Sequence, residues 1–316
     1  MNKIFDCIIL GAGPAGMSAG IYCARGNIKC AIMDITMFGG APVNYLEIEN
    51  YPGFKEIEGW ELSEKFEEHL NKFNIEKFPM IEIKSIDLVS DIKTITDING
   101  VEYKAKSIIL ATGAKPQKLG VEGEIENIGK GVSYCAVCDG AFYKDKTVAV
   151  VGGGNAALEE GSYLTRFAKK VYIIHRRDEF RADKIVQDRA RKNEKLEFVL
   201  DTVVEKIING GAGVSQIEVK NVKTGKISTL DVDGVFPYIG FKPNCELFNG
   251  QVEQDQNGFV KTDVFMQTNV EGVFAIGDLR TTPLRQVITA VADGAIAGVS
   301  AVKYLEKIEA EALIKN

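Results

Sequence analysis

The fold of this chain is decided by a short stretch near its beginning, Ile8-Ile9-Leu10-Gly11-Ala12-Gly13-Pro14-Ala15-Gly16. The apolar run at residues 4–10 is typical of a buried strand, and residues 14–25 suit a helix. A second strand, residues 29–33, then ends at Asp34. This order predicts a β-α-β unit whose glycines allow a tight turn, close approach of backbone to a pyrophosphate, and close helix–strand contact. The helix N-terminus would offer free N–H groups to the phosphates.

The same arrangement occurs again in the middle of the chain. A strand over residues 147–151 leads into Gly152-Gly153-Gly154-Asn155-Ala156-Ala157, and a helix over residues 157–167 follows. One such unit would indicate an ordinary dehydrogenase, whereas two units indicate a chain that binds two dinucleotides.

The two units differ where their second strand ends. The first ends in an acid, which suits a ribose 2′-hydroxyl, and the second, over residues 171–174, runs into a basic segment. The basic residues are His175, Arg176, Arg177 and Arg181. Guanidinium groups bind a 2′-phosphate through charge-assisted bonds, so the second unit is predicted to take NADPH rather than NADH. The alternative is a solvated basic face of a helix over residues 181–192, which is the interpretation preferred for Arg189, Arg191 and Lys192.

Two further strand ends carry small or polar residues. Residues 107–113 form a buried strand ending in Ala111-Thr112-Gly113, where small residues let the backbone approach a cofactor, although a plain strand end is the alternative. Residues 268–278 form another strand that closes on Gly277-Asp278, and a helix over residues 285–302 follows. The Asp278 carboxylate is able to accept a hydrogen bond from a polyol or ribityl hydroxyl.

Six cysteines do not make a disulfide framework here. Four are scattered in apolar surroundings and are interpreted as unreactive buried thiols: Cys7, Cys23, Cys30 and Cys245. Cys135 and Cys138 are close together, and in a reducing compartment such a pair is redox-active or metal-binding. Zinc would need more ligands, yet there is no second close pair and the only histidines are His69 and His175.

Composition limits the other possibilities. The length of 316 residues fits about two domains, and the net charge of −6 argues against binding of nucleic acid or an anionic membrane. No apolar run approaches the roughly 20 residues needed to span a bilayer, and the N-terminus lacks the features of a signal peptide. We therefore expect a cytoplasmic protein.

Together these motifs resemble those of the low-molecular-weight bacterial thioredoxin reductases, which are NADPH-dependent flavoprotein disulfide reductases. The stretch Cys135-Ala-Val-Cys138-Asp139-Gly140, between the two nucleotide units, is the most specific of them. The other matching stretches, in the family's order, are residues 11–16, 47–54, 111–113, 152–157, 175–182 and 277–290. The resemblance implies an α/β homodimer with two Rossmann-like dinucleotide-binding domains of the three-layer ββα type. The NADPH domain, residues 114–241, would be inserted in a discontinuous FAD domain, residues 1–113 and 242–316, and would rotate to present the nicotinamide or the dithiol to the flavin.

The same resemblance implies the cofactor-binding residues. FAD would be held by Gly11, Gly13, Pro14, Ala15, Gly16, Asp34, Gly39, Gly40, Asn50, Ala111, Thr112, Gly113, Gly277, Asp278, Arg285, Gln286 and Val287. NADPH would be held by Gly152, Gly154, Asn155, Ala156, His175, Arg176, Arg177 and Arg181. Two departures stand out, since the family commonly has a glutamine where this chain has Ala41-Pro42, and Asp-Ser where it has Asn155-Ala156.

By analogy with the family, electrons pass from NADPH to FAD and reach the disulfide through Cys138, which frees Cys135 to attack thioredoxin or a thioredoxin-like protein. Exchange of this kind needs a thiolate. The adjacent carboxyl, Asp139, is the candidate acid–base group, with a helix or turn cap as the alternative role. The competing hypotheses are a ferredoxin-dependent flavin thioredoxin reductase, an NADPH–ferredoxin-type flavoprotein, and a flavin-binding redox sensor without enzymatic activity.

Overall fold

The computed structural model of this chain describes residues 4–44, 48 and 50–315, with residues 137, 138 and 315 described by their backbone alone. The chain divides into two compact units, Met1–Lys115 with Lys242–Asn316, and Pro116–Phe241. The chain passes from one unit to the other at β7 (Ala114–Pro116) and β15 (Phe241–Pro243), two short strands that pair with each other.

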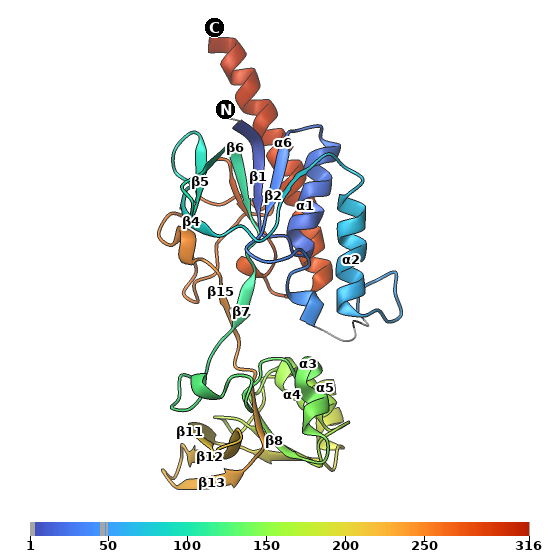
Figure 1. The fold of residues 1–316 in the computed structure, drawn as a ribbon, viewed down its shortest axis with the longest axis vertical. Coiled ribbons are helices and arrows are strands. Elements are labelled where there is room, and N and C mark those ends of the chain that lie inside the picture. Colours follow the sequence, from blue (N-terminus) through green and yellow to red (C-terminus); the bar gives the residue numbers. More distant parts are fainter. Residues whose placement is uncertain (1–3, 45–47, 49, 316) are drawn as a thin grey trace. The chain divides into compact units, whose positions relative to one another are not determined.

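The first unit is built on one sheet with the strand order β3-β2-β1-β6-β5-β4 (Figure 1). Its strands are β1 (Ile4–Leu10), β2 (Cys30–Met33), β3 (Glu76–Phe78), β4 (Ile83–Asp87), β5 (Lys93–Asp97), β6 (Glu102–Leu110) and β16 (Val273–Ala275). Strand β6 pairs with β5 antiparallel over its first half and with β16 parallel over its second half. Strands β1, β2 and β3 are parallel to one another and to β6, so their carboxyl ends meet at one edge.

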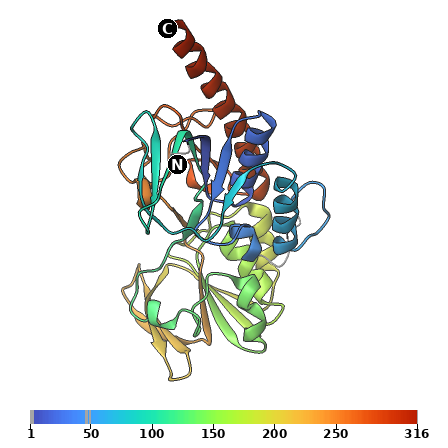
Figure 2. The same cartoon turned by 45° about the horizontal axis from the view of Figure 1, so that its top comes forward.

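Helices cover one face of this sheet. They are α1 (Pro14–Arg25), α2 (Gly59–Leu70) and α6 (Val287–Lys315), and short 3-10 turns lie at η1 (Ala41–Asn44), η4 (Glu246–Phe248) and η5 (Gly277–Leu279). Helices α1 and α6 run side by side in both views (Figures 1 and 2). A Cβ on Gly294 would lie 2.1 Å from the Ala15 carbonyl oxygen, and one on Gly298 would lie 2.9 Å from that of Ala19. The glycines of α6 thus let the two backbones approach.

Helix α6 differs from the predicted helix in its bounds, and its length and composition bear on membrane spanning. It begins and ends later than predicted, at Val287 and Lys315. Over Val287–Ile314 it is also long and apolar enough, by length and composition, to cross a membrane, and it is the one such helix in the described part of the chain. The expectation concerned uninterrupted apolar runs, and α6 contains none of that length, because Asp293 and Lys303 interrupt it. A core helix of a soluble protein meets the same criterion. The close packing of α6 on α1 accounts for the small residues Gly294 and Gly298, and 33% of the apolar window is buried.

The second unit has three layers. A parallel sheet of order β10-β9-β8-β14 lies between helices on one face and an antiparallel sheet on the other. The parallel strands are β8 (Thr147–Val151), β9 (Lys170–Ile174), β10 (Leu196–Val199) and β14 (Gly234–Pro237), and the antiparallel ones are β11 (Thr202–Asn209), β12 (Val214–Asn221) and β13 (Ile227–Asp231). The helices are α3 (Ala136–Asp139), α4 (Asn155–Leu164) and α5 (Lys184–Arg191), with 3-10 turns η2 (Ile125–Asn127) and η3 (Gly140–Tyr143). The predicted α/β class with two Rossmann-like units is confirmed.

Alternate side chains of the central strands fill two cores in each unit. In β8, Val148 and Val150 pack under the helices, whereas Ala149 and Val151 face the antiparallel sheet. Both faces of these strands are therefore buried, which explains why they read as continuous apolar runs. The differences from prediction are at the ends: β6 stops at Leu110, before Ala111, and α4 begins at Asn155 rather than at residue 157.

Candidate active site

The first glycine loop lies at the carboxyl edge of the parallel strands, between β1 and α1. A Cβ on Gly11, whose φ is +112°, would lie 2.2 Å from the Ala111 carbonyl oxygen, and a Cβ on Gly16 would lie 1.8 Å from that of Gly11. A Cβ on Gly40 would lie 2.7 Å from the Gly13 Cα. The N-cap of α1, Gly13, makes no side-chain capping bond. The start of α1 is therefore free of a side-chain cap at Gly13, as a phosphate bound at a helix N-terminus requires.

Asp34, at the end of β2, holds the loop in place. Its Oδ2 accepts a hydrogen bond from the Ala12 N–H at 2.7 Å, and its Oδ1 accepts from both the N–H and the hydroxyl of Thr36 at 2.8 Å. A carboxylate has about four lone-pair sites, so about one is left for a ribose hydroxyl. Asp34 thus shapes the loop in addition to the predicted ribose contact.

Residues far apart in the sequence join the predicted FAD residues. The Thr112 hydroxyl donates to the Asn244 carbonyl oxygen at 2.7 Å, and the Asn244 side-chain amide donates to the Thr112 carbonyl oxygen at 2.8 Å. The Asn50 amide donates to the Gln286 side-chain oxygen at 2.9 Å. Two predicted residues, Asn50 and Gln286, are therefore brought together, and Asn244 is a supporting residue that the sequence motifs did not indicate. Glu47 and Glu49, in the matching stretch beside Asn50, lie outside the described residues.

The Gly277-Asp278 turn is tied to helix α6 by a second unpredicted pair. The Gly277 N–H donates to Asp293 Oδ2 at 3.1 Å, and the Arg280 guanidinium lies 3.4 Å from the same oxygen. The side chains of Arg280 and Asp293 are 14% and 12% exposed. Burial raises the pKa of Asp278, an effect that Arg285 opposes. A carboxylate that is half removed from water is well suited to a hydroxyl donor.

Arg285 shows that this turn fits a cofactor. Its guanidinium lies 3.9 Å from the centroid of the Phe259 ring, and its buried Nε has no hydrogen-bond partner. A buried N–H without an acceptor is rare in proteins, and the oxygen of a bound flavin nucleotide would satisfy it. Together with the uncovered loop, this orphaned donor fits FAD.

The Asp293 pair leads to a prediction about FAD. Replacing Asp293 by alanine removes the acceptor of the Gly277 N–H and leaves Arg280 unpaired in a largely buried position. We expect the Kd of FAD, titrated into apoprotein by flavin fluorescence, to rise at least about tenfold, because the turn carrying Asp278 loses its anchor. Asp293→Asn, which keeps an acceptor, should lose less, and Glu311→Gln on the exposed end of α6 should change nothing. Wild-type FAD affinity in Asp293→Ala would contradict this role.

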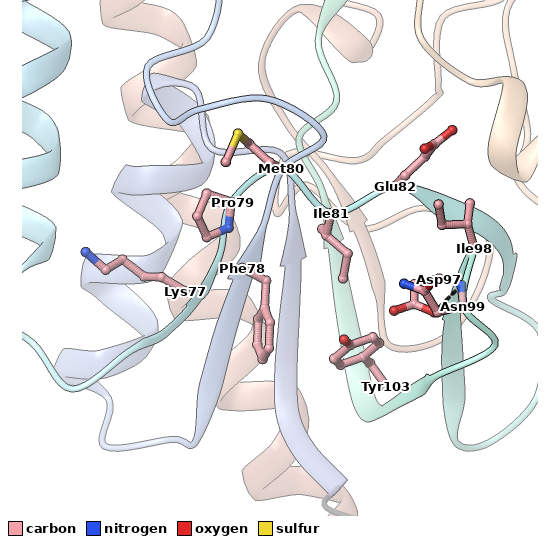
Figure 3. Close-up of a pocket in the computed structure, with 10 residues that line it drawn as sticks. All are labelled: Lys77, Phe78, Pro79, Met80, Ile81, Glu82, Asp97, Ile98, Asn99 and Tyr103. Carbon is pink, nitrogen blue, oxygen red and sulfur yellow. Dashed lines mark hydrogen bonds between the residues drawn. The ribbon is translucent and has the colours of Figure 1, made fainter.

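A hollow of about 440 Å³ in the first unit is lined by the segment after β3 and by the turn between β5 and β6 (Figure 3). The side chains of Phe78, Ile81 and Tyr103 project into it. The rings of Phe78 and Tyr103 pack edge to face, with their centroids 5.2 Å apart. The Asp34 backbone bonds to Phe78 and to Ile81 beside it. The hollow thus reaches the segment that Asp34 holds, but its lining contains none of the predicted site residues.

The second glycine loop repeats the geometry of the first. A Cβ on Gly152 would lie 2.2 Å from the Tyr238 carbonyl oxygen, so that position is closed to other residues. Gly154 is the N-cap of α4 without a side-chain cap, and a Cβ there would meet nothing within 4 Å. The Gly154 backbone thus faces open space where a pyrophosphate would lie.

The basic segment after β9 divides into two parts. His175 is 5% exposed, stacks on Phe180 and lies against Gly153, where a Cβ would be 2.3 Å from the imidazole. Burial lowers its pKa, and the nearby arginines act in the same direction. His175 is thus a neutral support under the loop. Within the described part of the chain no carboxylate pairs with the exposed Arg176, Arg177 or Arg181, so these side chains remain available to an anion.

The dithiol stretch lies on the short helix α3. Cys135 is half-buried and forms a disulfide, whereas the side chain of Cys138 lies outside the described residues. The Cys135 N–H donates to the Ser133 hydroxyl at 3.1 Å, and the Ala136 N–H donates to the Tyr238 hydroxyl at 2.8 Å. The N–H of Asp139, which is half-buried, donates to the Cys135 carbonyl oxygen at 3.2 Å. Ser133 and Tyr238 fix the start of α3, and no motif pointed to either.

One more carboxyl in this unit has an altered titration. Burial, and to a lesser extent Glu159, raises the pKa of Glu160 on α4 to about 7. The turn η3, which directly follows α3, packs against the end of α4, since a Cβ on Gly140 would lie 3.3 Å from Leu164. Glu160 is therefore a carboxyl with a raised pKa in the same unit as the dithiol.

The other cysteines are free thiols, and all four are buried, as predicted. Burial raises the pKa of Cys30 to about 12 and that of Cys245 to about 11. Thiols with such values hold little thiolate at neutral pH, so they take no part in exchange.

Comparisons with known proteins agree on one family. The family model "Pyridine nucleotide-disulphide oxidoreductase" matches residues 5–294. The thioredoxin reductase of Listeria innocua is 46% identical over 98% of this chain and 96% of its own. The crystal structure of Lactococcus lactis thioredoxin reductase superposes with a TM-score of 0.90 at 42% identity, covering 96% of this chain and 99% of that one. A ferredoxin-flavin thioredoxin reductase structure from Clostridium acetobutylicum gives a TM-score of 0.54 at 33% identity, covering 97% and 99%.

Proposed function

The chain belongs to the pyridine nucleotide-disulphide oxidoreductase family, and within it to the thioredoxin reductases, and from this premise we propose the path of its electrons. NADPH is the donor, FAD the carrier, the Cys135–Cys138 pair the internal disulfide, and thioredoxin or a thioredoxin-like protein the acceptor. The observation that carries this proposal is the disulfide at Cys135, which in the sequence lies between two glycine loops whose helices both start without a side-chain cap.

The first unit is the FAD domain in this proposal. Its loop binds the pyrophosphate, Asp34 the ribose, and Arg285 a flavin nucleotide oxygen through the orphaned Nε. When bound, the flavin accepts two electrons from the nicotinamide and passes them to the disulfide. Ala41-Pro42, where the family commonly has a glutamine, opens η1 and carries no amide side chain that could touch the flavin.

The second unit is the NADPH domain in this proposal. Gly154 leaves room for the pyrophosphate, and the three exposed arginines bind the 2′-phosphate. Cys135 attacks the disulfide of thioredoxin as a thiolate, and Asp139, the carboxyl that directly follows Cys138 in the sequence, exchanges the proton. The protein acts as a homodimer in the cytoplasm, as its family resemblance implies.

A ferredoxin-dependent reductase is the second candidate. It is disfavoured because such an enzyme has no use for a dinucleotide loop followed by unpaired arginines, and this chain has both. A sensor or a ferredoxin-type flavoprotein would likewise leave the dithiol without a substrate.

One titration separates these functions. Adding NADPH anaerobically to the purified holoprotein should bleach the flavin absorbance, and adding oxidised thioredoxin should restore it with continued NADPH consumption. Bleaching without turnover would indicate a different acceptor. No bleaching by NADPH, with bleaching by reduced ferredoxin, would replace the proposed donor.

A further inference from the structure

Four hydrogen bonds join the second glycine loop to the basic segment. The Arg181 and Ala182 N–H groups donate to the Gly153 carbonyl oxygen at 2.7 and 3.1 Å. The Asp183 N–H donates to Asn155 Oδ1 at 2.7 Å, and Asn155 Nδ2 donates to Asp183 Oδ2 at 2.7 Å. The three consecutive backbone N–H groups of residues 181–183 are thus bound to the loop.

Asp183 is used in an unusual way. It is the N-cap of α5, where an aspartate ordinarily accepts a hydrogen bond from its own helix, yet its side chain makes no capping bond. The carboxylate bonds instead to Asn155, the first residue of α4. This arrangement forgoes a cap that contributes about 1 kcal/mol and links two helix N-termini.

Asn155 is correspondingly occupied. Both its amide nitrogen and its carbonyl oxygen bond to Asp183, so its side chain is directed to the basic segment and not to a phosphate. This explains why asparagine serves here, since only a side chain with one donor and one acceptor makes both bonds. An aspartate at this position would face the Asp183 carboxylate.

We propose that Asn155 and Asp183 form a clamp that sets the distance between the pyrophosphate loop and the 2′-phosphate arginines, and so determines the selectivity for NADPH. This inference rests on the proposed NADPH site. The pyrophosphate and the 2′-phosphate of NADPH are attached to the same ribose at a fixed spacing. The glycine loop and the basic segment must therefore be held at a matching distance to bind both groups at once. NADH has no 2′-phosphate, so its binding does not depend on the distance between the loop and the arginines. Asn155 is therefore a positioning residue.

The test exchanges the two side chains. Asn155→Asp opposes two carboxylates, whereas the double variant Asn155→Asp, Asp183→Asn restores one donor and one acceptor with the wild-type net charge. The preference for NADPH over NADH is measured as the ratio of the two kcat/KM values. We expect Asn155→Asp to lower this ratio about tenfold, because the variant loses the equivalent of one to two net hydrogen bonds. The exchanged pair should recover the preference to within about threefold. Asp188→Asn, which makes the same change as Asp183→Asn at an exposed site of α5, controls for the lost carboxylate and should leave the ratio unchanged.

Calorimetry with two probes, adenosine 2′,5′-bisphosphate and AMP, gives a readout independent of the flavin. The clamp is supported by three results together: the wild type binds the bisphosphate more tightly than AMP, Asn155→Asp loses this preference, and the exchanged pair regains it. If Asn155→Asp retains the preference, or the exchanged pair fails to regain it while Tm is normal, the clamp is overturned and the NADPH site stands. If the wild type shows no preference for the bisphosphate, the proposed NADPH site is overturned and the clamp with it.

Discussion

Replacing Cys138 by serine will abolish reduction of thioredoxin while NADPH still bleaches the flavin. A serine hydroxyl forms no disulfide, so Cys135 is left without its exchange partner and the electrons have no exit. Loss of a nucleophile of this kind lowers turnover on the order of 10³-fold or more. Steady-state turnover measures the reduction of thioredoxin, and stopped-flow bleaching of the flavin absorbance measures the reduction of the flavin by NADPH.

The matched control is Cys245→Ser. Cys245 is a free, buried thiol whose Sγ donates to the Gly258 carbonyl oxygen at 3.6 Å, and a hydroxyl is able to make the same bond. Thioredoxin turnover should remain near the wild-type rate in this variant. Wild-type turnover in Cys138→Ser would show that electrons do not pass through the proposed pair.

Replacing Arg176, Arg177 and Arg181 together by alanine will erode the preference for NADPH over NADH by at least tenfold. Each charge-assisted hydrogen bond to a 2′-phosphate contributes roughly 1.5–3 kcal/mol, and none of these guanidinium groups pairs with a carboxylate in the described part of the chain. The ratio of kcat/KM values for the two nucleotides measures the effect, which should fall mainly on the NADPH term and weaken with salt.

A charge-matched control comes from helix α5. Lys184, Arg189 and Lys192 are exposed, so changing all three to alanine removes the same charge without touching the predicted phosphate contacts. Arg191 is left in place, because its guanidinium lies within 5.9 Å of the Phe180 and Phe198 ring centroids and supports the core. Its prediction as part of a plain solvated face was incomplete for this reason. An equal loss of NADPH preference in both triple variants would contradict a specific 2′-phosphate contact, because it would show only a general attraction between the basic surface and the nucleotide.

The local elements were predictable because their signals are local. Strand β1 and helix α1 have the predicted bounds, Ile4–Leu10 and Pro14–Arg25, since an apolar run, a glycine turn and a proline at the first helical turn all lie within about 20 residues. The end of α6 was missed because the polar residues after residue 302 weaken the apolar pattern without breaking the helix. The inward-facing His175 was also missed, since a histidine beside three arginines resembles a phosphate ligand until its burial is known.

The amino-acid sequence by itself determined that this chain has two dinucleotide-binding units with a close cysteine pair between them, and this was enough to place it in its family. Only the tertiary structure decided which residues hold those motifs in position. Asn244 meets Thr112 across 132 positions, Arg280 meets Asp293 on a separate helix, and Asn155 meets Asp183 across 28 positions. The reason is physical: glycine spacing and hydrophobic period report on neighbours along the backbone, whereas a hydrogen bond between distant side chains exists only once the sheet has brought their elements together.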